Sequence, residues 1–155
     1  LVRSRGLGDV YKRQQMEFDL GLAVREDSEN PVYYVQYAHA RICTLLKNLA
    51  ADGHTVPSPD AVDFSLLTDS TELALIKQIA GYSDIVRLAA RDYDPSFINR
   101  YLTDLAAAFH KFYNACRIKG EAEDLLNARL LLADTARSVL KNGMELIGCS
   151  APEKM

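Results

Sequence analysis

Apolar residues recur every three or four positions along most of the chain, which is the spacing of one buried face of an α-helix. The first such segment runs from about Pro31 to Ala51. Its apolar stripe consists of Val35, Ala38, Ile42, Leu45, Leu46 and Leu49. Asn30-Pro31 signals the start of a helix because proline is favoured at the first helical position, and Gly53 predicts its end. We expect residues 52–68 to form a linker loop.

A second helical region is predicted from about Ser70 to Arg91. Its apolar positions are Leu73, Leu75, Ile76, Ile79, Ile85, Val86, Leu88 and Ala89. Gly81 divides them into two groups, so the pattern fits either one kinked helix or two short helices.

Two further helices are predicted, from Pro95 to about Lys119 and from Glu121 to about Ile147. The stripe of the third helix is Ile98, Leu102, Leu105, Ala106, Phe109, Phe112 and Cys116, with Gly120 as its expected C-cap. The stripe of the fourth helix is Leu125, Ala128, Leu132, Ala136, Val139, Leu140, Leu146 and Ile147. Four or five amphipathic helices without a strand signal predict an all-α helical bundle.

Residues 1–14 lack this periodicity, and we interpret them as a non-native segment derived from an adaptor or vector. A genuine basic arm that binds RNA is the alternative. The chain of 155 residues suits one domain, with 48% hydrophobic and 25% charged residues. No apolar run is long enough for a membrane span, so we expect no membrane partner. Three widely spaced cysteines support neither zinc nor a disulfide framework, and we expect reduced, buried thiols in a cytoplasmic protein.

The net charge of −3 argues against non-specific binding of nucleic acid, but its distribution is uneven. Residues 30–51 contain Arg41 and Lys47 and no acidic residue. Residues 95–119 contain four basic residues against Asp104 alone. Two locally basic helices in an acidic domain favour a limited, oriented contact with phosphates.

Tyr34, Tyr37 and Arg41 are spaced i, i+3 and i+7, so they share one strip of the first helix, at the border of its apolar stripe. Aromatic rings beside an arginine are suited to stacking unpaired bases while the guanidinium meets a phosphate. The alternative is that these tyrosines cover the rim of the core. Gln36 and His39 lie around the other side, where a lone histidine is more often a packing or hydrogen-bonding residue than a metal ligand.

His110, Tyr113 and Arg117 repeat this spacing on the third helix, so the two helices could form one groove, although coincidence is the simpler explanation. Catalytic patterns are missing from the sequence, which has no glycine-rich phosphate loop and no GxSxG motif. We therefore expect no catalytic residues, no metal site and no cofactor in this chain.

The run from Asn30 to Arg41, NPVYYVQYAHAR, resembles the hallmark of arginyl-tRNA synthetases. Met16–Ala23, Leu102–Arg117 and the segment from Asn127 to Gly143 are also similar to that family, as is the ending Ser150–Met155. The similarity covers roughly residues 16–155. It implies the C-terminal anticodon-binding domain of the DALR type, with residues 15–29 as a connector from a missing catalytic domain and 30–155 as the helical domain.

The resemblance implies a parent class I enzyme that attaches arginine to tRNA-Arg using ATP and Mg²⁺. This chain would bind the anticodon arm, contact its own missing catalytic domain, act as a monomer and be inactive alone. Tyr34, Tyr37 and Tyr113 would contact bases, Met155 would touch an anticodon-loop base, and the loop ending at Asn30 would press on the anticodon loop. We add Gln36 and His110 to this surface, and infer phosphate contacts for Arg41 and Arg117 from charge and spacing. The alternative function is a helical protein-interaction module with no role in RNA binding.

Overall fold

The computed structural model describes residues 21, 24–27 and 29–155, and the regular structure in this part of the chain is entirely helical. The α-helices are α3 (Pro31–Ala51), α4 (Ser70–Ala80), α5 (Tyr82–Asp92), α6 (Ser96–Ala115) and α7 (Glu123–Leu146). Two 3-10 helices, η1 (Pro59–Ala61) and η2 (Phe64–Leu66), lie in the connection between α3 and α4. The predicted all-α bundle is confirmed. Residues 1–14, interpreted as an adaptor segment, lie outside the described residues.

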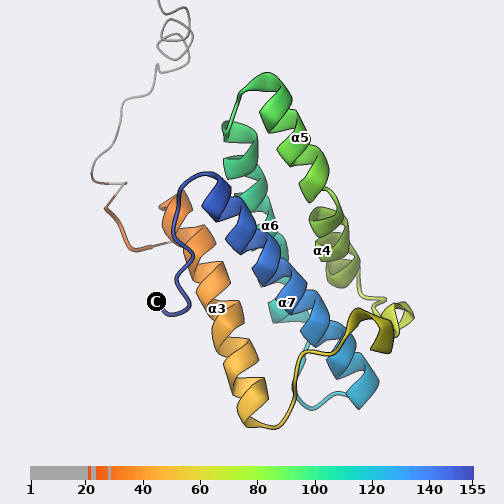
Figure 1. Ribbon diagram of the computed structural model, residues 1–155. Helices are drawn as coiled ribbons and strands as arrows, with labels where there is room; N and C mark the ends of the chain where they lie inside the picture. The colour runs from red at the N-terminus through yellow and green to blue at the C-terminus, as the bar shows by residue number, and fades with distance from the viewer. Residues whose placement is uncertain (1–20, 22–23, 28) are drawn as a thin grey trace, which may run out of the picture.

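Helix α6 is the centre of the bundle, because it packs against α3, α4, α5 and α7. Figure 1 shows α7 in front of α6, with α3 on one side of this pair and α4 and α5 on the other. All seven residues of the stripe predicted for α6 are buried, and Phe109 and Phe112 are fully so. The stripe on α6 therefore anchors the hydrophobic core and fixes where the faces of α3 and α7 meet.

Both ends of α3 follow their sequence signals. The side chain of Asn30 accepts hydrogen bonds from the backbone N–H groups of Val32 and Tyr33, which caps the first turn. At the other end Gly53 adopts a φ of 92°, and the N–H of His54 donates to the carbonyl of Leu49. This reversal is the Schellman arrangement that glycine favours, so the helix ends where its sequence predicts.

The third predicted helix is shorter than expected. It ends at Ala115 rather than near Lys119, and Gly120 lies in the following turn rather than at the helix end. Cys116 is extended, and both Cys116 and Ile118 are buried. Side chains that alternate in this way point inward only if the backbone is extended, so burying Ile118 requires the helix to stop. Gly81 separates α4 from α5, which decides for two short helices over one kinked helix.

Three apolar expectations were wrong. Leu73 is one of the apolar positions of the second predicted region and Leu146 is part of the stripe of the fourth, but they are 53% and 57% exposed. Cys149 was expected to be buried and is only partly so, whereas Cys43 and Cys116 are buried as free thiols. The errors lie on the outward side of α4 and at the end of α7, where few elements are available to cover an apolar side chain. None of the described helices combines the length and the apolar character needed to cross a lipid bilayer.

Candidate nucleic-acid interface

Aromatic side chains from α3 and α6 meet on one open surface. The rings of Tyr33 and Tyr37, one helical turn apart, are nearly parallel at 7°, with centroids 6.4 Å apart. The ring of His110 on α6 lies 5.3 Å from that of Tyr34 and 5.9 Å from that of Tyr37. These four side chains, with Arg41 and Asn114, line a hollow of about 480 Å³. Rings that present faces and edges to an open hollow can accept a further flat ring.

Arg41 links the two helices at the edge of this hollow. Its guanidinium carbon lies 4.4 Å from the centroid of the Tyr113 ring, within the range of a cation–π contact. Its Nη1 atom lies 3.4 Å from Nδ1 of His110. An arginine can only donate, so Nδ1 of His110 must be the acceptor and carry no proton. Burial, followed by the charge of Arg41, lowers the pKa of His110, which agrees with a neutral ring. We call Tyr33, Tyr34, Tyr37, Arg41, His110 and Tyr113 the tyrosine surface.

The exposure of these side chains distinguishes the two interpretations of the tyrosines. Tyr34 and Tyr113 are partly buried and pack against the core, as the rim interpretation expects. Tyr37 is 41% exposed, and Arg41 retains access to solvent beside it. The inner side of the surface therefore packs against the core, and its outer side is accessible to a partner.

Met155 lies at the border of the tyrosine surface and is half exposed. It shares a hollow of about 210 Å³ with Tyr37, Arg41 and Tyr113. On its other side it contributes to a hollow of about 510 Å³ that includes Tyr33 and Gln36. An unbranched thioether beside aromatic rings can adapt to a partner of irregular shape.

Six of the predicted site residues lie on or beside the tyrosine surface, Asn30 and Gln36 line the adjoining hollow beside Met155, and Arg117 lies apart. The structure brings together Tyr34, Tyr37, Arg41, His110, Tyr113 and Met155. Asn30 caps α3, and its Nδ2 atom donates to the carbonyl of Arg25, so it organises the loop before the helix. Gln36 donates to the backbone of Ser150. Arg117 is exposed but lies beyond the end of α6, so the helical spacing from which its role was inferred does not apply.

The sequence reasoning missed Tyr33 and Asn114. The spacing of Tyr33 and Tyr37, four residues apart, is the signal that could have identified Tyr33, because side chains at i and i+4 lie one above the other on a helix. Asn114 follows the same rule, since it lies four residues after His110.

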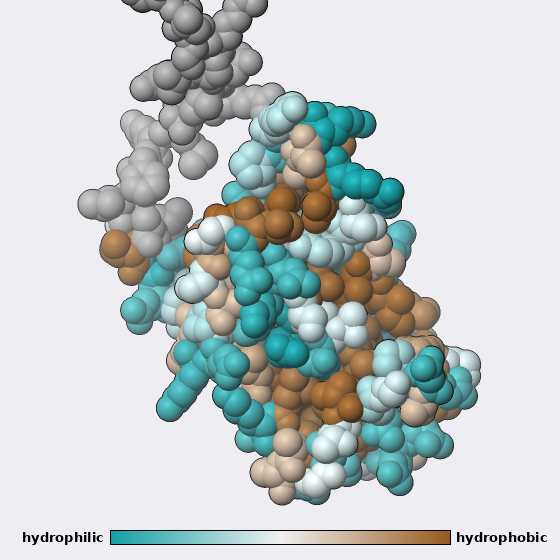
Figure 2. Space-filling model, viewed as in Figure 1, coloured by the Kyte–Doolittle hydropathy of each residue, from teal (hydrophilic) through white to brown (hydrophobic). Residues whose placement is uncertain are grey.

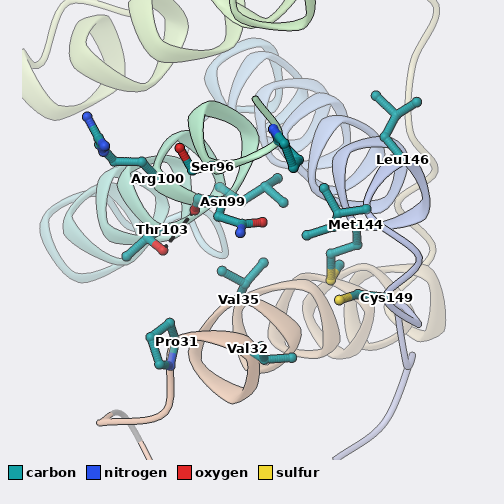
Figure 3. A pocket seen from close by; sticks show the side chains of 13 residues that line it. Pro31, Val32, Val35, Ser96, Asn99, Arg100, Thr103, Met144, Leu146 and Cys149 are labelled. Atoms are coloured by element: carbon teal, nitrogen blue, oxygen red, sulfur yellow. Dashed lines mark hydrogen bonds between the residues drawn. The ribbon is translucent and has the colours of Figure 1, made fainter. Parts of the chain in front are cut away.

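A larger hollow, of about 780 Å³, lies between the starts of α3 and α6 and the end of α7. Figure 3 shows Val35 facing Asn99 and Met144 across it, with Cys149 at one side. Figure 2 shows apolar side chains gathered over this end of α7 and also where α7 meets α4. Arg100 is the one charged residue of its lining, so this hollow suits contact with an apolar surface better than recognition of RNA. Within the described part of the chain, no three His, Cys, Asp or Glu side chains are grouped so that they could hold a metal ion.

Comparison with known proteins gives a consistent result. Residues 35–155 match the family described as the DALR anticodon binding domain. The chain is 50% identical over 140 residues to an arginine–tRNA ligase of Ruminiclostridium cellulolyticum, and 47% identical to one of Acetivibrio thermocellus. Each alignment covers 90% of this chain and 25% of the relative, so the chain spans about a quarter of their length. The solved arginyl-tRNA synthetase of Thermus thermophilus is 29% identical, with a TM-score of 0.75 over 90% of this chain and 24% of that one.

Proposed function

The chain belongs to the DALR anticodon-binding domain family, and from this premise we propose that it binds the anticodon arm of tRNA-Arg as one part of an arginine–tRNA ligase. The longer enzyme would join arginine to tRNA at the expense of ATP, in the cytoplasm. Family membership supports RNA binding over the alternative of a protein-interaction bundle.

The observation that carries the proposal is the tyrosine surface. Unpaired bases of an RNA loop are recognised by stacking on aromatic rings and by hydrogen bonds to their edges. Tyr37 offers an exposed ring for stacking, and the Tyr33 ring parallel to it extends the platform by one helical turn. Arg41 is held against Tyr113 at the edge, where its remaining donors can reach a phosphate. Base stacking and one charge contact therefore come from adjacent side chains.

We assign the chemistry of ligation to the catalytic part of the longer protein. A glycine-rich loop is one common way to bind the phosphates of ATP, and Mg²⁺ takes oxygen ligands. The described residues provide neither a glycine-rich loop nor a cluster of carboxylates. The missing catalytic part would then be the second partner of this chain besides tRNA.

The substitution Tyr37→Ala tests the assignment. Loss of one stacked base is expected to weaken binding of a tRNA-Arg anticodon stem-loop by about 1–3 kcal/mol, measured by fluorescence anisotropy with labelled RNA. Tyr37→Phe should bind nearly as well as the wild-type chain, because it keeps the ring and loses only the hydroxyl.

Tyr93→Ala is the matched control, since Tyr93 is 92% exposed at the end of α5, on the opposite side of α6 from α3. Equal affinities for Tyr37→Ala and the wild-type chain would remove the stacking role. A wild-type chain that binds no stem-loop would instead support the protein-interaction alternative.

A further inference from the structure

The tail of the chain, residues 149–155, does not extend away from the bundle. After α7, Gly148 adopts a φ of 74°, and the N–H of Cys149 donates to the carbonyl of Met144. This turn directs the tail across α3, and Figure 1 shows the chain passing along α3 to end beside it. A short segment without secondary structure needs specific partners to keep one position.

Two side chains of α3 supply those partners. Nε2 of Gln36 donates to the carbonyl of Ser150 at 2.9 Å and lies 3.1 Å from its Oγ atom. Nδ1 of His39 lies 2.8 Å from the carbonyl oxygen of Pro152. A carbonyl only accepts, so Nδ1 of His39 must carry the proton. The spacing i, i+3 places both donors on the same face of the helix, under the tail.

His39 is the more constrained of the two donors. It is 1% exposed, and the Sγ atom of Cys43 lies 3.8 Å from its Nδ1 atom. Burial lowers its pKa, so the ring is neutral and has one N–H group to donate. A buried donor without a partner is costly, so the carbonyl of Pro152 is held where His39 can reach it. The exposed ion pair of Lys47 with Glu153 adds little to this contact.

The tail contacts end at the tyrosine surface. Three residues after Pro152, Met155 lies beside Tyr37, Arg41 and Tyr113. The tail contributes no fully buried side chain to the core, although Cys149 and Ala151 pack against it. The position of Met155 can therefore change without loss of the bundle.

We propose that His39 and Gln36 are positioning residues for RNA binding, which hold the tail across α3 so that Met155 completes the tyrosine surface. The proposal rests on the proposed function, because it assigns the purpose of the contact to RNA. Neither residue needs to touch RNA, since both act through the tail.

The position of the tail can be measured without RNA. The chain has three methionines, so a spectrum of the full chain with ¹³C-labelled methionine methyl groups contains three signals. Met144, 1% exposed, reports whether the bundle is folded, and Met155 reports whether the tail is docked near the rings. His39→Leu should move the Met155 signal toward its position in a free peptide and leave that of Met144 in place. His39→Asn, whose Nδ2 can replace the donor at Nδ1, should restore it at least in part. If His39→Leu also shifts the Met144 signal, the substitution has disturbed the bundle. Gln36→Leu is then the variant to use, because Gln36 lies nearer the surface.

Binding of the anticodon stem-loop then tests the purpose. His39→Leu is expected to raise the Kd about two- to tenfold, the range for one lost hydrogen bond. The same substitution combined with Met155→Ala should cost no more than Met155→Ala alone, because both act through one contact. If the losses of affinity from His39→Leu and Met155→Ala add in the double variant, His39 does not act through Met155, and the proposal is overturned.

The remaining outcomes separate this proposal from the proposed function. If the Met155 signal does not move in either His39→Leu or Gln36→Leu, the positioning role is overturned. It is also overturned if the tail is displaced but the affinity for RNA stays the same. A wild-type chain that binds no stem-loop refutes the proposed function, and the positioning role for RNA falls with it, whereas the Met155 signal still reports the docking of the tail.

Discussion

At the scale of single residues, Arg41 shows how one side chain depends on two neighbours. Its guanidinium lies over Tyr113 and its Nη1 atom faces Nδ1 of His110. Protonation of His110 would replace an acceptor by a second cation and oppose Arg41. His39 also stays neutral in the folded chain, because burial disfavours its charged form.

These two histidines predict how stability depends on pH. Both have a folded-state pKa below the ordinary value of about 6.5, so the unfolded chain takes up protons at a pH where the folded chain does not. Their contribution is complete above about pH 6.5, and the free energy of unfolding should fall as the pH drops below this value. Urea denaturation between pH 7.5 and 5 measures this, with His110→Asn expected to show a smaller loss. Stability that rises on acidification in this range would contradict the argument.

Helical spacing identifies three of the four α3 residues of the tyrosine surface and misses Tyr33. Tyr34, Tyr37 and Arg41 follow from helical spacing alone, because the geometry of one helix is known in advance. Arg117 shows the limit, since the burial of Ile118 ends α6 early, and that burial depends on helices distant in the sequence. The hydrogen bond from His39 to Pro152 joins residues 113 positions apart, and no local pattern contains it.

At the scale of helices, one buried ion pair joins elements that the sequence keeps apart. Glu72, fully buried on α4, accepts from Nε of Arg129 on α7 at 2.6 Å. Its other oxygen accepts from the backbone N–H of Asp69, which completes a capping box at the start of α4. Arg129 also donates to the carbonyl of Arg117, in the loop after α6. The pair therefore fixes α4, α7 and this loop relative to one another.

Arg129→Met should leave the carboxylate of Glu72 buried without its cation. Removal of one partner of a buried pair typically costs about 3–5 kcal/mol, so the free energy of unfolding should fall by roughly that amount in urea denaturation. Arg87→Met is the matched control, because Arg87 pairs with Asp84 at an exposed position of α5 and should cost less than about 1 kcal/mol. If both variants lose a similar free energy of unfolding, the buried ion pair stabilises the fold no more than the exposed one.

At the scale of the whole molecule, an acidic chain offers RNA a small basic region. The net charge is −3, and Arg41 is the one cation of the tyrosine surface. Binding should therefore depend more on stacking than on the release of counterions. The helical segments and most of their buried faces could be predicted from the sequence, although it left open four or five helices. The central place of α6 could not be predicted, since the apolar stripes can be paired in several ways.

Salt dependence measures this balance. With roughly one phosphate neutralised by Arg41, the logarithm of the binding constant should fall with the logarithm of salt concentration with a slope of about −1. Arg41→Gln should reduce the magnitude of the slope by nearly one, and Arg87→Gln should leave it unchanged. A slope steeper than about −5 would indicate that RNA binds a different, more basic surface.

The course of the tail also bears on synthesis of the protein. Residues 149–155 leave the ribosome after every helix of the bundle, and domains generally fold as the chain emerges. Helix α3 emerges before α7 and the tail, so Gln36 and His39 lack these hydrogen-bond partners until Ser150 and Pro152 arrive. A nascent chain that stalls within α7 would therefore have the tyrosine surface without Met155 at its border.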